Sequence, residues 1–270
     1  MSEPTAIGPH ADSLMRTIER VRQKAEVDMQ AVEAREAERL AKYQGWAASP
    51  EGQAAIAEQK RAAAARRAAE QFKMWTAAAQ QIRIPRRFVA ATLQNVDPAD
   101  FAPGTDITPI QATVERVRRY LSDEYPKGHA LALCGLHGLG KSYAAAAALR
   151  VLFEHESYRG PMFWNATTLR TALMNLEKRG AIIADLLDGP MLVLDDLGLE
   201  YSREGDYWEG VLDTIFVERE GNLLLLLVTT NLNPEKLEQK LGPRAWDRLM
   251  GSWGAVFEVV GKSVRGKEAT

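Results

Sequence analysis

The 270-residue chain contains a single cysteine, Cys134. One cysteine excludes both a disulfide within the chain and a cysteine-based zinc site, and this scarcity fits a reducing compartment. The sequence also lacks an apolar run of the roughly 20 residues needed to cross a bilayer, because its most apolar stretch, residues 223–228, is far shorter. The amino terminus has no basic-then-apolar secretory pattern. We therefore expect a soluble, cytoplasmic protein with no membrane contact.

The chain also has no large excess of charge of one sign, since 34 Lys and Arg oppose 36 Asp and Glu. This balance excludes a uniformly basic nucleic-acid-binding protein, so any nucleic-acid contact needs a local patch. Arg170, Lys178 and Arg179, near Trp164 in the sequence, are candidate DNA contacts. The same charges equally suit a solvated helix face, because stacking platforms usually contain several aromatic side chains.

The sequence from about residue 13 to residue 81 is rich in Ala, Glu, Arg, Lys and Gln and predicts helices. In its first half, apolar residues recur at steps of three and four and so share one face: Met15, Ile18, Val21, Ala25, Met29 and Val32. Such a stripe either packs within the chain or docks a partner. Ser49, followed by a proline, predicts the cap of a second helix.

Residues 135–142 read GLHGLGKS and lie between a short apolar run and an alanine-rich stretch. This order predicts a strand, a phosphate-binding loop and a helix. Glycines let the backbone wrap a phosphate, and the loop amides and helix N-terminus supply positive potential. The expected nucleotide-binding residues are Gly135, Gly138, Gly140, Lys141, Ser142 and Tyr143, with Lys141 reaching the terminal phosphates and the Ser142 hydroxyl on magnesium. The alternative is a glycine-rich turn with a surface lysine.

Residues 191–198 read MLVLDDLG. The apolar residues predict a buried strand, and the two carboxylates lie at its carboxyl end, where ligands bind in open α/β sheets. Asp195 is the candidate magnesium ligand beside Ser142, and Asp196 is a candidate for polarising the water that attacks the terminal phosphate. In the alternative interpretation, the two aspartates only end the strand and begin a turn.

Residues 223–231 read LLLLLVTTN and predict a central strand whose tip reaches the same edge as the aspartates. Asn231 there is a candidate for sensing the terminal phosphate or holding the water. Alternatively, Asn231 only caps the helix that begins near Pro234.

Strands and helices alternate from the phosphate loop to about residue 260, which indicates a parallel sheet covered on both faces. Among these elements we expect a helix over residues 167–179, a strand over residues 191–195 and a helix over residues 234–240. We predict an α/β fold with a five-stranded parallel sheet flanked by helices. The expected divisions are a helical N-terminal region (1–84), an extended linker (85–108) and a nucleotide-binding domain (109–270).

The order of these motifs, continued by TTNLNPEKLEQKLGPRAWDRL and GKSVR, resembles the AAA+ ATPases. Within them it is similar to the DnaC-type replicative helicase loaders and the related IstB-like transposition helper ATPases. The likeness runs from about residue 84 to residue 265 and includes the lead-in IPRRFVAATLQNV. It implies a P-loop AAA+ core in which Lys141 and Ser142 are Walker A contacts, Asp195 and Asp196 are the Walker B pair, and Asn231 is the first sensor.

The resemblance also assigns two arginines. Arg248 matches the arginine finger that reaches a neighbouring subunit's nucleotide, with Arg244 as the alternative finger, and Arg265 matches the second sensor. Surface pairing with Asp247 or Glu238 is the alternative role for the first two. Many AAA+ proteins have Glu in place of the second Walker B aspartate, so we expect slow turnover. The short sequence after Arg265 implies a minimal C-terminal lid or none.

The resemblance implies an ATPase that uses ATP and Mg²⁺ to load a replicative hexameric DNA helicase onto single-stranded DNA during replication initiation. The N-terminal helices would grip the helicase, and the ATPase domains would self-assemble through the ATP site. The alternative is a helper that assists a transposase on double-stranded DNA. The long alanine-rich helices favour the loader. A monomeric small-molecule kinase is disfavoured, because the sequence has no arginine-rich acceptor lid.

Overall fold

The computed structural model describes residues 9–94, 96, 101, 104–124, 129–156, 162–198, 207–251 and 253–264. The chain divides into two compact units, Met1–Ala69 and Glu70–Thr270. The domain limits expected at residues 84 and 108 stay predictions.

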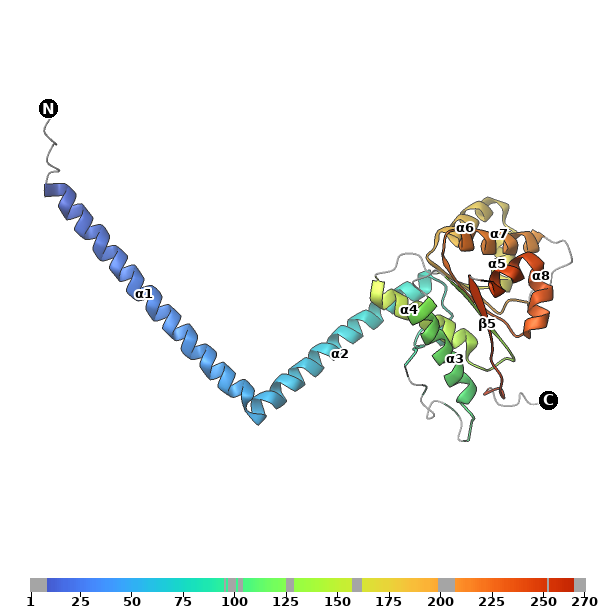
Figure 1. Cartoon of the computed structure of the whole chain (residues 1–270), viewed down its shortest axis with the longest axis horizontal. Helices are drawn as coiled ribbons and strands as arrows, with labels where there is room; N and C mark the ends of the chain where they lie inside the picture. The colour runs from blue at the N-terminus through green and yellow to red at the C-terminus, as the bar shows by residue number, and fades with distance from the viewer. Residues whose placement is uncertain are drawn as a thin grey trace, which may run out of the picture. The chain divides into compact units, whose positions relative to one another are not determined.

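The first unit consists of a long helix and the greater part of a second one, α1 (Pro9–Ala48) and α2 (Pro50–Gln81) (Figure 1). Ser49 separates the two helices and caps α2, since its Oγ accepts a hydrogen bond from the Gly52 amide at 3.0 Å. This confirms the cap expected from the sequence. A Cβ atom on Gly52 would lie 1.8 Å from the Trp46 carbonyl oxygen, so the tight turn requires glycine. The local sequence therefore defines the corner between the helices.

The apolar stripe of α1 faces solvent where its side chains are described. Val21, Met29 and Val32 are 65%, 63% and 53% exposed. In the described part of the first unit, these three side chains therefore pack against no other helix. The other predicted members have side chains outside the described set: Met15, Ile18 and Ala25.

The second unit is built on a parallel five-stranded sheet in the order β2-β3-β4-β1-β5, which confirms the predicted fold class. The strands are β1 (Ala130–Cys134), β2 (Met162–Asn165), β3 (Met191–Asp195), β4 (Leu225–Thr229) and β5 (Gly254–Glu258). Strand β4 pairs with both β1 and β3. The tip of β4 consequently lies between the strand before the phosphate loop and the strand that carries the two aspartates.

Helices cover both faces of the sheet (Figure 1). One face packs against the last turns of α2, α3 (Thr108–Arg119) with its π-helical extension η3 (Tyr120–Glu124), and α4 (Lys141–Glu156). The other face packs against α5 (Ala166–Leu173), α6 (Leu176–Asp188), α7 (Tyr207–Gly221) and α8 (Pro234–Met250). The alanines at 144–148 in α4 are fully buried. Their small side chains allow α4 to approach the sheet closely and so fix the loop that precedes it.

Two helices differ from the sequence prediction. The single helix expected over residues 167–179 is two helices, because α5 ends at Leu173 and Asn175 caps α6 by accepting hydrogen bonds from the amides of Glu177 and Lys178. The helix expected to end near residue 240 continues to Met250, across a non-helical glycine, Gly242, with φ of 73°. In the first case Asn175 divides a stretch whose apolar periodicity predicts one helix. In the second case α8 continues past Gly242, where the sequence predicts that the helix has already ended.

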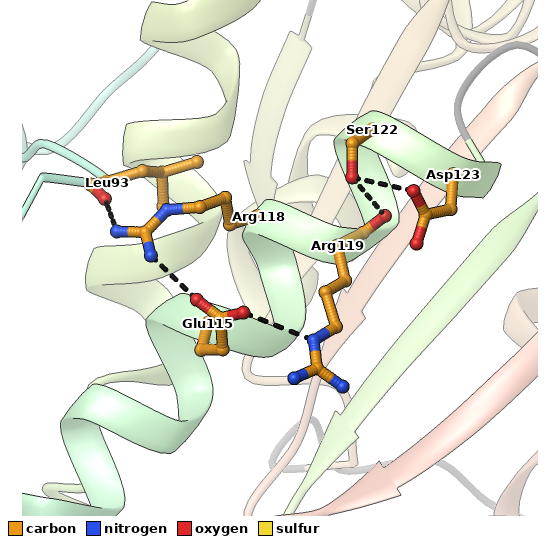
Figure 2. Close-up of polar contacts among 6 residues, drawn as sticks. All are labelled: Leu93, Glu115, Arg118, Arg119, Ser122 and Asp123. Atoms are coloured by element: carbon orange, nitrogen blue, oxygen red, sulfur yellow. Dashed lines mark hydrogen bonds and ion pairs between the residues drawn. The ribbon is translucent and has the colours of Figure 1, made fainter.

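The lead-in to the sheet is partly buried. It contains a short 3-10 helix, η1 (Arg86–Phe88), and Ile84 and Leu93 belong to the core. Arg118 of α3 donates hydrogen bonds to the Leu93 carbonyl and, at 2.6 Å, to the Glu115 carboxylate (Figure 2). Over these residues the segment expected to be an extended linker is instead anchored to the domain.

A buried arginine joins α6 to the start of β4. Arg219 of α7 is fully buried. Its Nε and Nη2 donate to the Leu225 carbonyl at 3.2 and 2.6 Å, and its Nη1 donates to the Leu186 carbonyl at 2.7 Å. The guanidinium therefore provides hydrogen-bond donors for a carbonyl in the last turn of α6 and for the carbonyl of the first residue of β4.

Replacing Arg219 with methionine should lower the free energy of unfolding by about 2–5 kcal/mol, because two buried carbonyls lose their donors. Urea unfolding followed by circular dichroism measures the change. The matched control is Lys178→Met on the exposed surface of α6, expected to stay within about 0.5 kcal/mol of the parent chain. Equal effects of the two changes would show that the Arg219 contacts add nothing to stability.

Candidate nucleotide-binding site

The loop between β1 and α4 has the backbone of a phosphate cradle. Gly135, Gly138 and Gly140 have φ values of 126°, 76° and 79°, which side chains rarely allow. A Cβ atom on Gly135 would lie 2.3 Å from the Val259 carbonyl oxygen, and one on Gly140 would lie 2.8 Å from Cγ2 of Ile110. At Gly135 and Gly140 both the positive φ and the close neighbouring atoms therefore favour glycine. The loop runs directly into the N-terminus of α4, where amides favour an anion.

Lys141 is the first residue of α4, directly after this loop, and is 5% exposed. Its Nζ donates to the carbonyl oxygens of Gly135 and Leu136, each at 2.7 Å, and to Oδ1 of Asn231 at 3.1 Å. The surface-lysine alternative does not fit a buried ammonium held in this way. The charge is already positioned against the loop that would surround a phosphate.

Asn231 connects the loop to the aspartates. Its Nδ2 donates to Oδ1 of Asp196 at 3.4 Å, while its Oδ1 accepts from Lys141. The helix cap that was the alternative role belongs to Asn233, whose Oδ1 accepts from the Lys236 amide at 3.0 Å. Asn231 is thus at the tip of β4 between the two motifs, as the strand order requires.

Asp195 is 2% exposed and lies at the carboxyl end of β3. Its carboxylate accepts hydrogen bonds from the hydroxyls of Ser142 and Thr229, the latter at 2.6 Å. Burial raises the pKa of Asp195 above its usual value, and these hydrogen bonds and the charge of Arg87 partly oppose that shift. Carboxylate and hydroxyl oxygens are the hard donors that Mg²⁺ prefers, and a cation would offset the burial of the carboxylate. Ser142 and Asp195 therefore fit the ion.

Asp196 turns the chain sharply after β3. Its φ of 56° is left-handed, a conformation that Asp tolerates better than most residues. Its amide donates to Oγ1 of Thr229 at 3.0 Å, which stabilises the turn. The two adjacent carboxylates consequently have different partners. Asp195 accepts a hydrogen bond from Ser142, and Asp196 accepts one from Asn231. The turn and the proposed chemical role are compatible.

Thr229, which the sequence places only at the sheet edge, is a further candidate residue of this site. It contacts both Asp195 and Asp196. Its position two residues before Asn231, at the end of a buried strand, is the sequence signal that could have assigned it. Tyr143 is among the expected nucleotide-binding residues. Its hydroxyl accepts a hydrogen bond from the Thr92 amide at 3.2 Å. That contact ties α4 to the lead-in segment.

The two candidate fingers lie on α8. Arg248 is 29% exposed, and its Nε lies 2.7 Å from Oε2 of Glu220 in an ion pair that lacks hydrogen-bond alignment. Arg244 is 82% exposed and has Nη1 4.0 Å from Oδ2 of Asp213. Both arginines therefore pair with α7, rather than with the acidic residues that the sequence suggested.

Three further residues singled out in the sequence add nothing to this site in the described structure. Arg265 lies outside the described residues. Arg179 donates to the Leu173 carbonyl at 2.8 Å and stacks on Tyr207 at 4.3 Å, contacts that occupy it within the domain. Burial raises the pKa of Cys134 to about 12, so its thiol stays neutral and is no nucleophile.

No protein-family model and no curated protein matches this sequence. Solved structures do match. The crystal structure of the DnaC helicase loader is 23% identical over 65% of this chain and 100% of that chain, with a TM-score of 0.54. The crystal structure of DnaI is 23% identical over 67% and 94%, with a TM-score of 0.53. The replication initiator DnaA bound to AMPPCP and single-stranded DNA is 18% identical over 67% and 53%, with a TM-score of 0.51.

Over about two thirds of its length, the chain shares the fold of these DnaC, DnaI and DnaA structures. The resemblance that the motifs suggested is thereby confirmed at the level of the fold. Within this domain, the phosphate loop, the two aspartates and Asn231 share one edge of the sheet. In the part of the chain that the structure describes, no helix has the length and apolar content to span a membrane.

Proposed function

We propose that this chain is an ATP-dependent loader that places a replicative DNA helicase onto single-stranded DNA, acting in the cytoplasm as an AAA+ switch in replication initiation. The observation that carries the proposal is the contact chain from Lys141 through Asn231 to Asp196, at the sheet edge where β1, β4 and β3 end. A fold matched over the full length of a DnaC helicase loader structure supports a loader among AAA+ roles.

The site has groups for each part of ATP hydrolysis. Loop amides and the Lys141 ammonium would bind the triphosphate, with Nζ exchanging backbone carbonyls for phosphate oxygens. Ser142 and Asp195 would hold Mg²⁺, which neutralises phosphate charge when bound. Asp196 would accept the proton of the attacking water, and the Asn231 amide would orient that water.

Coupling to assembly follows from Asn231 and Arg248. Because Asn231 contacts both Lys141 and Asp196, a change at the phosphates alters both partners together. Arg248 would complete the site of a neighbouring subunit, so hydrolysis would depend on assembly. ATP shifts such an assembly only by its differential affinity for the two states. The N-terminal helices would hold the helicase, and single-stranded DNA would favour release.

Capture of a purified hexameric helicase tests the proposal. The full chain is compared with a chain lacking residues 1–69, which retains the whole compact unit Glu70–Thr270, including the buried Trp75. We expect the full chain to capture the helicase with ATP and Mg²⁺, and the shortened chain to lose capture while still binding ATP. Equal capture by both chains contradicts the role of the N-terminal region. Binding of a transposase on double-stranded DNA, without helicase capture, would favour the alternative function.

A further inference from the structure

The apolar stripe of α1 has an 11-residue repeat that continues toward the corner with α2. Two series recur at this interval: Ile18, Met29 and Leu40, and Val21, Val32 and Tyr43. Eleven residues complete three turns at about 3.67 residues per turn, close to the 3.6 of an undistorted helix. The stripe therefore runs almost straight along the helix, whereas a heptad stripe would wind around it.

This stripe is uncovered over its described length. Val21, Met29, Val32, Leu40 and Tyr43 are between 53% and 65% exposed. At about 1.5 Å per residue, the 40 residues of α1 span roughly 60 Å. At 100° per residue Glu36 falls in line with Ile18 and interrupts the stripe. The apolar residues on either side of Glu36 still form a long exposed face, which packing against a second helix of similar length would stabilise.

The charges beside the stripe differ between its two edges. At 100° per residue, Glu19, Glu26 and Glu33 fall along one edge. Lys24, Arg35, Arg39 and Lys42 fall along the other edge. All seven residues are exposed. Arg22, which lies 3.8 Å from Glu26 and falls in line with Leu40 on the acidic side of the stripe, and Asp28 on the basic edge reduce this asymmetry without reversing it.

We propose that α1 pairs with α1 of a second copy of this chain, in parallel and in register. A two-fold axis parallel to the helices places the acidic edge of each copy against the basic edge of the other. An antiparallel pair places like edges together, acid on acid and base on base. The charge pattern therefore selects both the occupant, a second copy, and its direction.

This pairing goes beyond the proposed loader activity and does not rest on ATP. It brings two AAA+ units together before any nucleotide is bound, and it leaves the faces of α1 opposite the stripe available to a helicase. A chain carrying Lys141→Ala should therefore pair normally. Failure of pairing and failure of nucleotide binding are consequently separate results.

Disulfide cross-linking tests contact and direction. Val21→Cys and Val32→Cys are introduced singly into the full chain and oxidised without nucleotide. In a parallel, in-register pair each residue meets its own copy, so each variant should form a covalent dimer in most of the chains. Gln23→Cys, on the opposite face of α1, is the control and should form little covalent dimer, although its chains still pair. Cross-linking at Val21 and Val32 no greater than at Gln23 overturns the pairing. Preferential cross-linking of Val21→Cys with Leu40→Cys chains overturns the direction.

Charge exchange tests the edges. One variant changes Glu19, Glu26 and Glu33 to Lys, and a second changes Lys24, Arg35 and Lys42 to Glu. By sedimentation without nucleotide, each alone should fall from about twice to once the chain mass of 29.9 kDa, with helicity kept by circular dichroism. An equimolar mixture should recover the doubled mass. A mixture that stays monomeric, or single variants that stay paired, contradicts the proposal, as does an unchanged parent chain that is monomeric yet binds a helicase.

Discussion

Replacing Lys141 with alanine should weaken the binding of magnesium ATP by about 10²-fold or more and remove hydrolysis. The Lys141 ammonium is 5% exposed and is held at the phosphate loop by Gly135, Leu136 and Asn231. Truncation removes a buried charged contact to the triphosphate, an effect of about 2–5 kcal/mol in binding free energy. Isothermal titration calorimetry with ATP and Mg²⁺ measures the loss.

Lys178→Ala is the matched control for this change, because Lys178 is exposed on α6 away from the loop. It should bind ATP with the affinity of the parent chain. Circular dichroism of both variants separates loss of the site from loss of the fold. Unaltered heat of ATP binding in the Lys141→Ala chain would show that this pocket is not the nucleotide site.

The phosphate loop and the buried strands could be predicted from the sequence because their determinants are local. An apolar run, glycines at fixed spacing and a following helix define the loop, and the strand expected at 191–195 is β3 with those bounds. The parallel alternation of elements then brings their carboxyl ends to one edge. For this reason the expected proximity of Ser142, Asp195 and Asn231 follows from topology alone.

The partners of these residues could not be predicted, because they come from distant segments. The pairing of Arg248 with Glu220 depends on how α7 packs against α8, and the contact of Arg118 with Leu93 depends on the path of the lead-in segment. The break at Asn175 was missed because its cap competes with an uninterrupted helical pattern. Amphipathicity located the stripe on α1 but did not say what covers it.

Replacing Arg248 with alanine should leave ATP binding unchanged and reduce the rate of hydrolysis by about 10³-fold. A guanidinium stays charged at all working pH values and stabilises the charge that develops on the transferred phosphoryl group. In the single chain Arg248 is paired with Glu220 at 2.7 Å, so assembly would exchange that carboxylate for a neighbour's phosphate. Steady-state hydrolysis and calorimetry on the same protein separate the two effects.

Glu220→Gln and Arg244→Ala are the comparison variants. Removing the Glu220 charge should keep hydrolysis at or above the parent rate, because Arg248 is released. If Arg248 served only the ion pair with Glu220, Arg248→Ala and Glu220→Gln would instead lower the free energy of unfolding by similar amounts. Loss of hydrolysis in Arg244→Ala with a normal Arg248→Ala chain would make Arg244 the finger, which its 82% exposure permits.

Mixing two inactive chains gives the sharpest test of a finger that acts between subunits. The Arg248→Ala chain keeps an intact phosphate loop, and the Lys141→Ala chain keeps an intact Arg248. Where they meet, one supplies the nucleotide site and the other supplies the guanidinium, so a mixture should recover part of the activity that each lacks alone. A mixture as inactive as its components would show that Arg248 does not act on a neighbour's nucleotide, because mixed assemblies must contain complete sites if it does.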